Sequence, residues 1–209
     1  MGAADGTPRR EGRPRRGEEL TWSRLGEAAI EVVAAHGVEG LTRGAVAERA
    51  GVSARATYRL APSTDDLISA AVTEWQRRWQ PPPDTGDWVD DLIEWSEATL
   101  AHMRAHSGLV AASLRMRPTR LDEEGTPVMM AATRLLVQGA GVSPEVAGDA
   151  CGVLSMHCLA WELTLDARMA QSADLDPEMV AQHEAFMKRG FRRGLTWILD
   201  GVRAEGETG

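Results

Sequence analysis

Residues 24–68 read RLGEAAIEVVAAHGVEGLTRGAVAERAGVSARATYRLAPSTDDLI, and this stretch decides the fold of the N-terminal part of the chain. An amphipathic segment is followed by two short apolar-periodic segments, which the triplet Gly51-Val52-Ser53 separates. A glycine bends the chain at such a turn, and a serine caps the helix that follows. The pattern predicts a helix-turn-helix, whose second helix enters the major groove of DNA.

The length and composition of the chain limit the classes to which it can belong. Its 209 residues allow one or two domains with a stable core. No apolar run approaches the roughly 20 residues that cross a bilayer, and the polar, Arg-rich N-terminus is no secretory signal. The two cysteines, Cys151 and Cys158, lie seven apart in a helical stretch, which is typical of small apolar fillers. We expect a cytoplasmic protein without a membrane partner.

The net charge of −8 argues against a nucleic-acid partner until its distribution is considered. Residues 1–60 have a balance of +2, whereas residues 61–209 have a balance of −10. The basic part therefore coincides with the predicted helix-turn-helix. Lys188 is the single lysine beside 22 arginines, a bias that indicates a GC-rich genome rather than a need for guanidinium chemistry.

Helical periodicity continues through the rest of the chain, and no segment shows the sustained alternation of a β-strand. We predict an all-α fold of about nine helices, in which a three-helix head with the helix-turn-helix joins a larger C-terminal bundle. The predicted helices span residues 21–36, 43–50, 54–60, 64–80, 87–106, 107–116, 126–138, 144–170 and 177–204. Prolines and glycines supply the breaks between them.

Three parts of the chain are predicted from this pattern. Residues 1–19 form an Arg-rich arm that cannot bury a core and is expected to be disordered. Residues 20–68 form the DNA-binding domain, and the helix that starts at Thr64 links it to the next part. Residues 69–209 form the larger bundle, a domain to which the family resemblance described below assigns ligand binding and dimerisation.

Candidate DNA-binding side chains gather on the helix predicted at residues 54–60 and at the helix starts around it. Arg55 and Arg59 lie four apart on one helix face, where arginines can read base edges or hold phosphates. Thr57 and Tyr58 add hydroxyl groups. The predicted set in the head comprises Thr42, Arg43, Ser53, Ala54, Arg55, Thr57, Tyr58, Arg59 and Thr64. The alternative interpretation is that these arginines only solvate a helix face.

The N-terminal arm contains Gly12-Arg13-Pro14-Arg15. Proline keeps the backbone extended, so Arg13 and Arg15 are candidates for insertion into a narrow minor groove. A tail that only aids solubility explains the same residues equally well, and both interpretations stay open.

These residues closely resemble the tetracycline-repressor (TetR) family of bacterial transcriptional regulators. The matching head residues are Ala28-Ala29, His36-Gly37, Leu41-Thr42, Val46-Ala47, Gly51-Val52-Ser53, Tyr58 and Asp66-Leu67. Residues 107–118, which end in LRMRP, and the segments Phe191–Leu195 and Leu199–Gly201 resemble the regulatory half of the tetracycline-repressor subgroup. The resemblance thus covers nearly the whole chain, more strongly in the head.

The resemblance implies a homodimer that binds palindromic operator DNA, with the last two long helices of each subunit at the interface. Two apolar stripes agree with this, and Gly190 and Gly194 permit close helix approach. The predicted interface residues are Cys151, Leu154, Cys158, Phe191, Gly194, Leu195 and Ile198. Such stripes are more often intramolecular core, so the resemblance carries most of this prediction.

Four positions depart from the family pattern. Ala61 replaces a usual aromatic residue, and Thr64 replaces a lysine that commonly touches a phosphate. Ser113 and Trp95 fall where the tetracycline-repressor subgroup places a magnesium-holding histidine and a drug-contacting asparagine. These departures predict that the magnesium–tetracycline site is absent.

A pocket for a flat or apolar effector is expected in the regulatory half, because the family resemblance implies one. Six of the seven tryptophans and eight of the nine methionines lie from Trp75 onward, and such groups suit an adaptable pocket. The predicted lining comprises Trp95, Thr99, His102, Met103, Ser113, Met116, Met129, Met130, Thr133, His157 and Trp161. Taken singly, each of these residues is more often a core filler. His102 and His106 have metal-ligand spacing without a nearby carboxylate, so no metal and no cofactor are predicted.

Three functions remain to be distinguished. The first is a repressor that a small hydrophobic or aromatic ligand releases from its operator. The second is a DNA-binding activator or architectural protein that needs no ligand. The third is a helical enzyme, which the sequence disfavours because it contains no phosphate-binding glycine loop, zinc motif or nucleophile–base pair.

Overall fold

A computed structural model describes residues 20–114, 121–171 and 176–208. Within these ranges the regular structure is helical, with nine α-helices, one short 3-10 helix and no β-strand, which confirms the predicted fold class. The elements are α1 (Trp22–His36), η1 (Val38–Gly40), α2 (Arg43–Ala50), α3 (Ala54–Leu60), α4 (Thr64–Arg77), α5 (Trp88–Arg104), α6 (Ser107–Ser113), α7 (Leu121–Ala140), α8 (Pro144–Gln171) and α9 (Pro177–Thr208).

The head consists of α1, α2 and α3, and its turns follow from a few residues. The Thr42 hydroxyl accepts a hydrogen bond from the Ala45 amide, and the Ser53 hydroxyl accepts one from the Ala56 amide, each at 3.2 Å. Gly51 ends α2 in the left-handed conformation, with φ 67° and ψ 31°, which glycine adopts without steric cost. These caps fix the bend between α2 and α3.

Helix α4 joins the head to the rest of the molecule, and it packs closely on α1 around Ala70 and Glu74. Gly26 of α1 is buried against the carbonyl oxygen of Ala70, and a Cβ atom at position 26 would lie 2.7 Å from the Glu74 Cβ. The Ser23 hydroxyl donates a 2.7 Å hydrogen bond to the Glu74 carboxylate, which is itself buried. The predicted domain boundary after Ile68 therefore falls inside a helix that packs on the head.

A Gly26→Ala variant tests this close approach. We expect it to lower the free energy of unfolding by about 1–3 kcal/mol, because the added methyl group meets the backbone of α4 and forces the helices apart. The measurement is urea denaturation followed by circular dichroism.

Gly44→Ala is the matched control, since the nearest atom to a Cβ there is 3.9 Å away. That substitution is expected to be neutral or stabilising by up to about 1 kcal/mol, because alanine favours a helix more than glycine does. If the two variants have the same free energy of unfolding, the added methyl group at position 26 separates α1 from α4 without a loss of stability.

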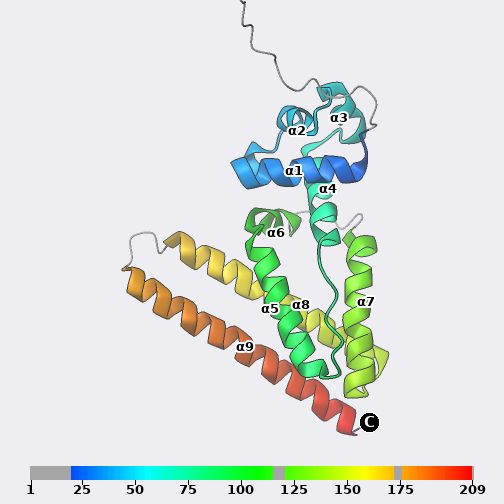
Figure 1. The fold of residues 1–209 in the computed structure, drawn as a ribbon, viewed down its shortest axis with the longest axis vertical. Coiled ribbons are helices and arrows are strands. Elements are labelled where there is room, and N and C mark those ends of the chain that lie inside the picture. The colour runs from blue at the N-terminus through cyan, green and yellow to red at the C-terminus, as the bar shows by residue number, and fades with distance from the viewer. Residues whose placement is uncertain (1–19, 115–120, 172–175, 209) are drawn as a thin grey trace, which may run out of the picture.

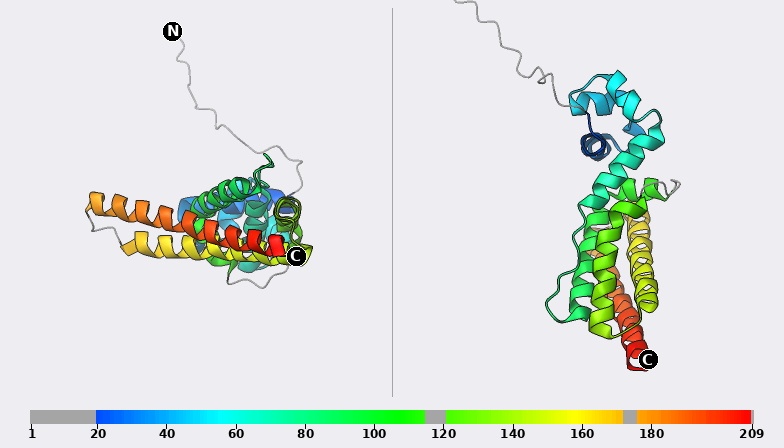
Figure 2. Two further views of the ribbon diagram at one scale, coloured as in Figure 1. Left: turned by 90° about the horizontal axis from the view of Figure 1, so that it is seen from below. Right: turned by 90° about the vertical axis from the view of Figure 1, so that its right-hand side faces the viewer.

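The body of the molecule is a bundle of α5 to α9. Figure 1 shows the head at one end of the long axis and the C-terminus near the other. Helices α8 and α9 run side by side over much of their length, as both views in Figure 2 show. The core of the bundle lies where α5, α7, α8 and α9 meet, and it includes Leu92, Leu136, Leu154 and Leu195.

Nine predicted helix termini differ from the observed ones by one to five residues, among them the end of α4, the start of α7 and the end of α9. Helix α4 stops at Arg77 rather than at residue 80, since Pro81 disfavours helical backbone in the residue before it. Helix α7 begins at Leu121 rather than at residue 126, with Pro127 inside it. Helix α9 extends to Thr208, four residues beyond its predicted end.

None of the helices in the described part of the chain combines the length and the apolar character that crossing a bilayer requires.

Candidate nucleic-acid interface and ligand cavities

The outer face of α3 presents a small group of polar and aromatic side chains. Arg55 and Arg59 are exposed, and Tyr58 between them is 58% exposed. In the part of the chain that the structure describes, neither arginine makes a hydrogen bond or an ion pair. Two guanidinium groups one helical turn apart are thus free to meet phosphates or the acceptor atoms of guanine.

The other arginines of the head hold the fold together. Arg24 donates a 2.8 Å hydrogen bond to the carbonyl oxygen of Ala50, at the end of α2. Arg49 forms an ion pair with Glu31 on α1. Arg43, a predicted DNA contact, donates a 2.8 Å hydrogen bond to the Pro62 carbonyl and lies 5.4 Å from the centre of the Tyr58 ring. Arg43 therefore supports Tyr58 and the start of α4.

The structure corrects one predicted DNA contact. Thr57 is 0% exposed and faces the core of the head, because position 57 lies on the opposite side of α3 from Arg55 and Arg59. Its hydroxyl cannot reach DNA unless the helix rotates. Thr42, Ser53, Ala54 and Thr64 are exposed at helix starts, where contact with DNA stays a prediction. Arg13 and Arg15 lie outside the described residues.

One cavity lies between α5 and the segment that links α4 to α5; we call it the Trp79 cavity. Its volume is about 410 Å³, within the range of small-molecule sites. It brings together three of the predicted pocket residues, Trp95, Thr99 and His102. The remaining lining residues are Arg78, Trp79, Gln80, Pro81, Pro83, Glu94 and Ala98.

Aromatic contacts connect this cavity to the C-terminal end of α4. The ring of His102 stacks on Trp75 with 5.3 Å between centroids, and Trp79 meets His102 edge-on at 6.1 Å. His102 Nε2 donates a 3.2 Å hydrogen bond to the Trp75 carbonyl oxygen. Burial lowers the pKa of His102 and so favours the neutral ring, although the hydrogen bond to the Trp75 carbonyl oxygen acts in the opposite direction. A ligand that displaces Trp79 or His102 would therefore disturb the end of α4.

The other predicted pocket residues are dispersed. Met103 is buried in the core, whereas Thr133 donates a hydrogen bond to the Met129 carbonyl where α7 packs on α8. Ser113 donates to Val110 within its own helix. Met130 is 56% exposed on the outside of α7, so its placement in a pocket was wrong: the pattern could not tell the inner from the outer face. Met116 lies outside the described residues.

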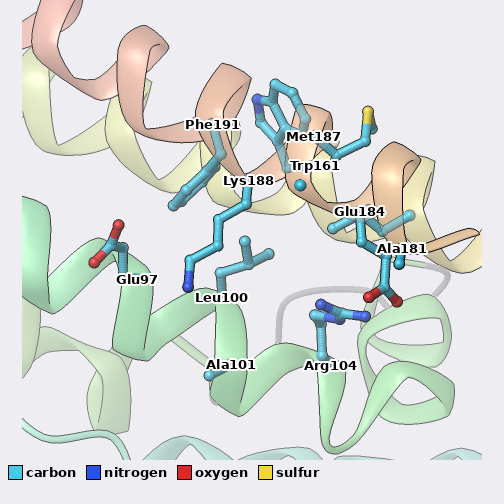
Figure 3. Close-up of a pocket in the computed structure, with 12 residues that line it drawn as sticks. Glu97, Leu100, Ala101, Arg104, Trp161, Ala181, Glu184, Met187, Lys188 and Phe191 are labelled. Atoms are coloured by element: carbon cyan, nitrogen blue, oxygen red, sulfur yellow. The ribbon is translucent and has the colours of Figure 1, made fainter. Parts of the chain in front are cut away.

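A second cavity, which we call the Lys188 cavity, lies between α5, α8 and α9 (Figure 3). Its volume is about 480 Å³, and Trp161 is the predicted pocket residue that lines it. His157, one helical turn before Trp161, instead stacks on Phe191 with 5.0 Å between centroids and donates a 3.1 Å hydrogen bond to the Phe191 carbonyl. His157 thus holds α8 to α9.

The predicted dimer residues face inward. Cys151, Leu154, Cys158, Phe191 and Leu195 are each at most 2% exposed within one chain, so they belong to its own core and cannot contact a second copy without repacking. Gly194 accommodates the ring of His157, and Ile198 is partly buried against the same core. Burial also raises the pKa of the Cys158 thiol to about 12, so this cysteine stays protonated as a core filler.

The opposite side of α8 and α9 carries the exposed apolar residues. On α8 these are Val153, Met156 and Leu163, and on α9 they are Met179, Phe186 and Trp197. We call this set the outer apolar face. Helix α8 is therefore apolar on two sides, one in the core and one exposed, and the sequence pattern alone identified only the first. The spacing of 153, 156 and 163 is the sequence signal that could have identified the second side.

His102 and His106 lie with their rings 5.3 Å apart, and both donate to backbone carbonyl oxygens. Among the described residues, no group of three or more histidines, cysteines or carboxylates could hold a metal ion.

Sequence reasoning missed much of both cavities. No pocket role was predicted for residues 78–81 and 83, which wall the Trp79 cavity, or for Lys188. The residues that line a cavity follow no periodic pattern in the sequence, because a cavity forms where separate helices leave the space between them unfilled.

The head matches a known family. Residues 25–71 match the sequence model described as bacterial regulatory proteins, tetR family. The HTH-type transcriptional repressor DrrR1 of Streptomyces coeruleorubidus is 35% identical over 102 residues, which are 47% of this chain and 38% of that protein. The match thus spans less than half of that relative.

Solved structures resemble the chain over most of its length. A single-residue variant of TetR from Acinetobacter baumannii AYE, in complex with minocycline, has a TM-score of 0.70 and 22% identity, covering 90% of this chain and 98% of that one. BioQ, a protein of Mycobacterium smegmatis, was solved with its double-stranded DNA operator. That complex has a TM-score of 0.64 and 21% identity, covering 88% and 99% of the two chains. At these identities the likeness shows the fold.

Proposed function

Because the chain belongs to the TetR family of transcriptional regulators, we propose that it is a repressor that binds palindromic operator DNA as a homodimer and is released by a small apolar or aromatic effector. The matched family consists of regulatory proteins, and no catalytic role is proposed.

The proposal that the chain binds DNA is supported by which arginines of the head have hydrogen-bond or ion-pair partners and which have none. Arg24, Arg43 and Arg49 are engaged within the chain, whereas Arg55 and Arg59 project from α3 without a partner among the described residues. A recognition helix needs such free donors at the major groove. BioQ, which shares this fold, was solved on its operator.

A homodimer is proposed from the outer apolar face. Soluble monomers rarely expose a contiguous group of large apolar side chains along two neighbouring helices. A two-fold axis across α8 and α9 would pair this face with itself and place two heads on two operator half-sites.

The Trp79 cavity is the proposed effector site, because it adjoins the end of α4. Helix α4 packs on α1, so a shift at Trp75 and Trp79 is transmitted to the head. An effector that prefers the shifted arrangement would move the population away from the spacing that fits the operator. The Acinetobacter baumannii TetR variant was solved with minocycline, a precedent for a multi-ring ligand in this fold.

An Arg55→Ala variant tests the proposed DNA contact. A genomic selection with the purified protein first identifies a specific palindromic site. We then expect Arg55→Ala to weaken binding to that site by about 1–3 kcal/mol, because a base or phosphate contact is lost. Fluorescence anisotropy with a labelled operator fragment measures the change.

Arg134→Ala is the control, since it removes the same charge from α7 in the body of the molecule. It is expected to leave operator affinity unchanged. If the selection yields no specific site, the proposed function fails. If operator affinity responds to no compound that binds the protein, the ligand-independent alternative holds.

A further inference from the structure

We propose that the Lys188 cavity is a second ligand site, separate from the Trp79 cavity, and that it takes an apolar or aromatic carboxylate. This inference concerns binding alone and holds whether or not the chain binds DNA.

The walls of the Lys188 cavity are apolar. Trp161 and Phe191 meet edge-on with 6.0 Å between centroids, and Leu100, Leu165, Met187 and three alanines form the rest of the apolar lining. The ring of Trp161 takes this position because Gly190 leaves room for it: a Cβ at position 190 would lie 2.8 Å from the ring. The volume of about 480 Å³ suits a molecule of two or three fused rings or its aliphatic equivalent.

The charged groups at the rim of the cavity do not cancel. Glu97 is neutralised by Arg192, whose Nη1 lies 3.0 Å from the Glu97 Oε1. Of the charged lining residues that remain, one is the acid Glu184 and two are the bases Arg104 and Lys188. The side chain of Lys188 extends from α9 toward α5, as Figure 3 shows.

Lys188 has no ion-pair or hydrogen-bond partner in the described part of the chain. An ammonium group at the edge of an apolar cavity matches a molecule that has an apolar body and one negative charge. Of the ligand types that fit the volume, the geometry thus favours a carboxylate over its neutral or cationic counterparts.

The test compares 2-naphthylacetate with 2-naphthylacetamide, which has the same shape without the charge. Binding to the full chain is measured by isothermal titration calorimetry in the absence of DNA. The acid is expected to bind at least about tenfold more tightly than the amide, because it gains a charge-assisted hydrogen bond to Lys188. This difference should shrink as the salt concentration rises.

Three substitutions locate the contact. Lys188→Met is expected to abolish the preference for the acid, Lys188→Arg to retain it, and Arg189→Met, which removes a neighbouring exposed charge, to leave it unchanged. Because Lys188 is the single lysine of the chain, acetylation followed by peptide mass spectrometry gives a second readout. The acid, but not the amide, should slow acetylation at Lys188.

A pair of alanines on α5 separates the two cavities. Ala101 lines the Lys188 cavity and Ala98 lines the Trp79 cavity, and both are exposed enough to accept a larger side chain. Ala101→Trp is expected to abolish binding of the acid, and Ala98→Trp to preserve it.

The proposal is overturned by equal affinity for acid and amide, by a preference that survives Lys188→Met, or by the reverse response of the two alanine variants. Absence of binding at millimolar concentrations overturns it as well. None of these outcomes bears on operator binding, which is measured with DNA and without the probe.

Discussion

A Met156→Glu/Trp197→Glu double variant is expected to be monomeric and to bind its operator more than about a hundredfold more weakly than the wild type, because one head alone loses the gain from simultaneous contact with two half-sites. Met156 is 61% exposed and Trp197 is 70% exposed on the outer apolar face. Both positions can carry a carboxylate in a single chain, but an apolar interface would bury those charges without partners. Size-exclusion chromatography with light scattering gives the mass, and fluorescence anisotropy gives the affinity.

Met130→Glu is the matched control for this variant. Met130 is also a strongly exposed methionine, but it lies on α7, away from the outer apolar face. Its substitution is expected to change neither mass nor operator affinity. A double variant that remains a dimer would place the interface elsewhere on the molecule.

The second large effect is expected from filling the proposed effector site. In an Ala98→Trp variant, the effector concentration needed to release the operator should rise by about a hundredfold or more, since a cavity of about 410 Å³ cannot hold both an added indole and a ligand. Operator affinity without effector should stay within about twofold of the wild type, because Ala98 makes no contact with the head.

The effector itself is found by thermal-shift screening of an aromatic library, since a ligand at 100 times its dissociation constant adds about 2.7 kcal/mol of stability. Ala101→Trp is the control, one turn further along α5. This variant should release the operator at the same effector concentration as the wild-type protein does. If Ala101→Trp blocks release and Ala98→Trp does not, the effector occupies the Lys188 cavity instead.

The sequence predicted the head closely because local chemistry determines it. Thr42 and Ser53 cap the helices that follow them, and Gly51 adopts the positive φ that its turn requires. The helices at residues 43–50 and 54–60 are confirmed at both ends. Each of these features depends on neighbours within about four residues, which a single sequence displays directly.

The orientation of the helices and the partners of their side chains could not be predicted from the sequence in the same way. Thr57 looked like a DNA contact because it lies beside Arg55 and Tyr58 in sequence, but the rotation of α3 about its axis buries it. Arg43 looked available until its partners, Pro62 and the Tyr58 ring, were located. The orientation of a helix depends on packing against residues far away in the sequence, and periodicity does not fix it when two faces are apolar.

The close contact between α1 and α4 has a consequence for chimeric regulators. Exchanging heads between proteins of this fold is a natural way to redirect a sensor to a new promoter, and the apparent junction lies after residue 68. A graft made there would join the α1 of one parent to the α4 of another, with foreign side chains opposite Gly26 and Ser23. The transplantable module instead extends to Arg77, and it must retain Trp75, which stacks on His102 of the body.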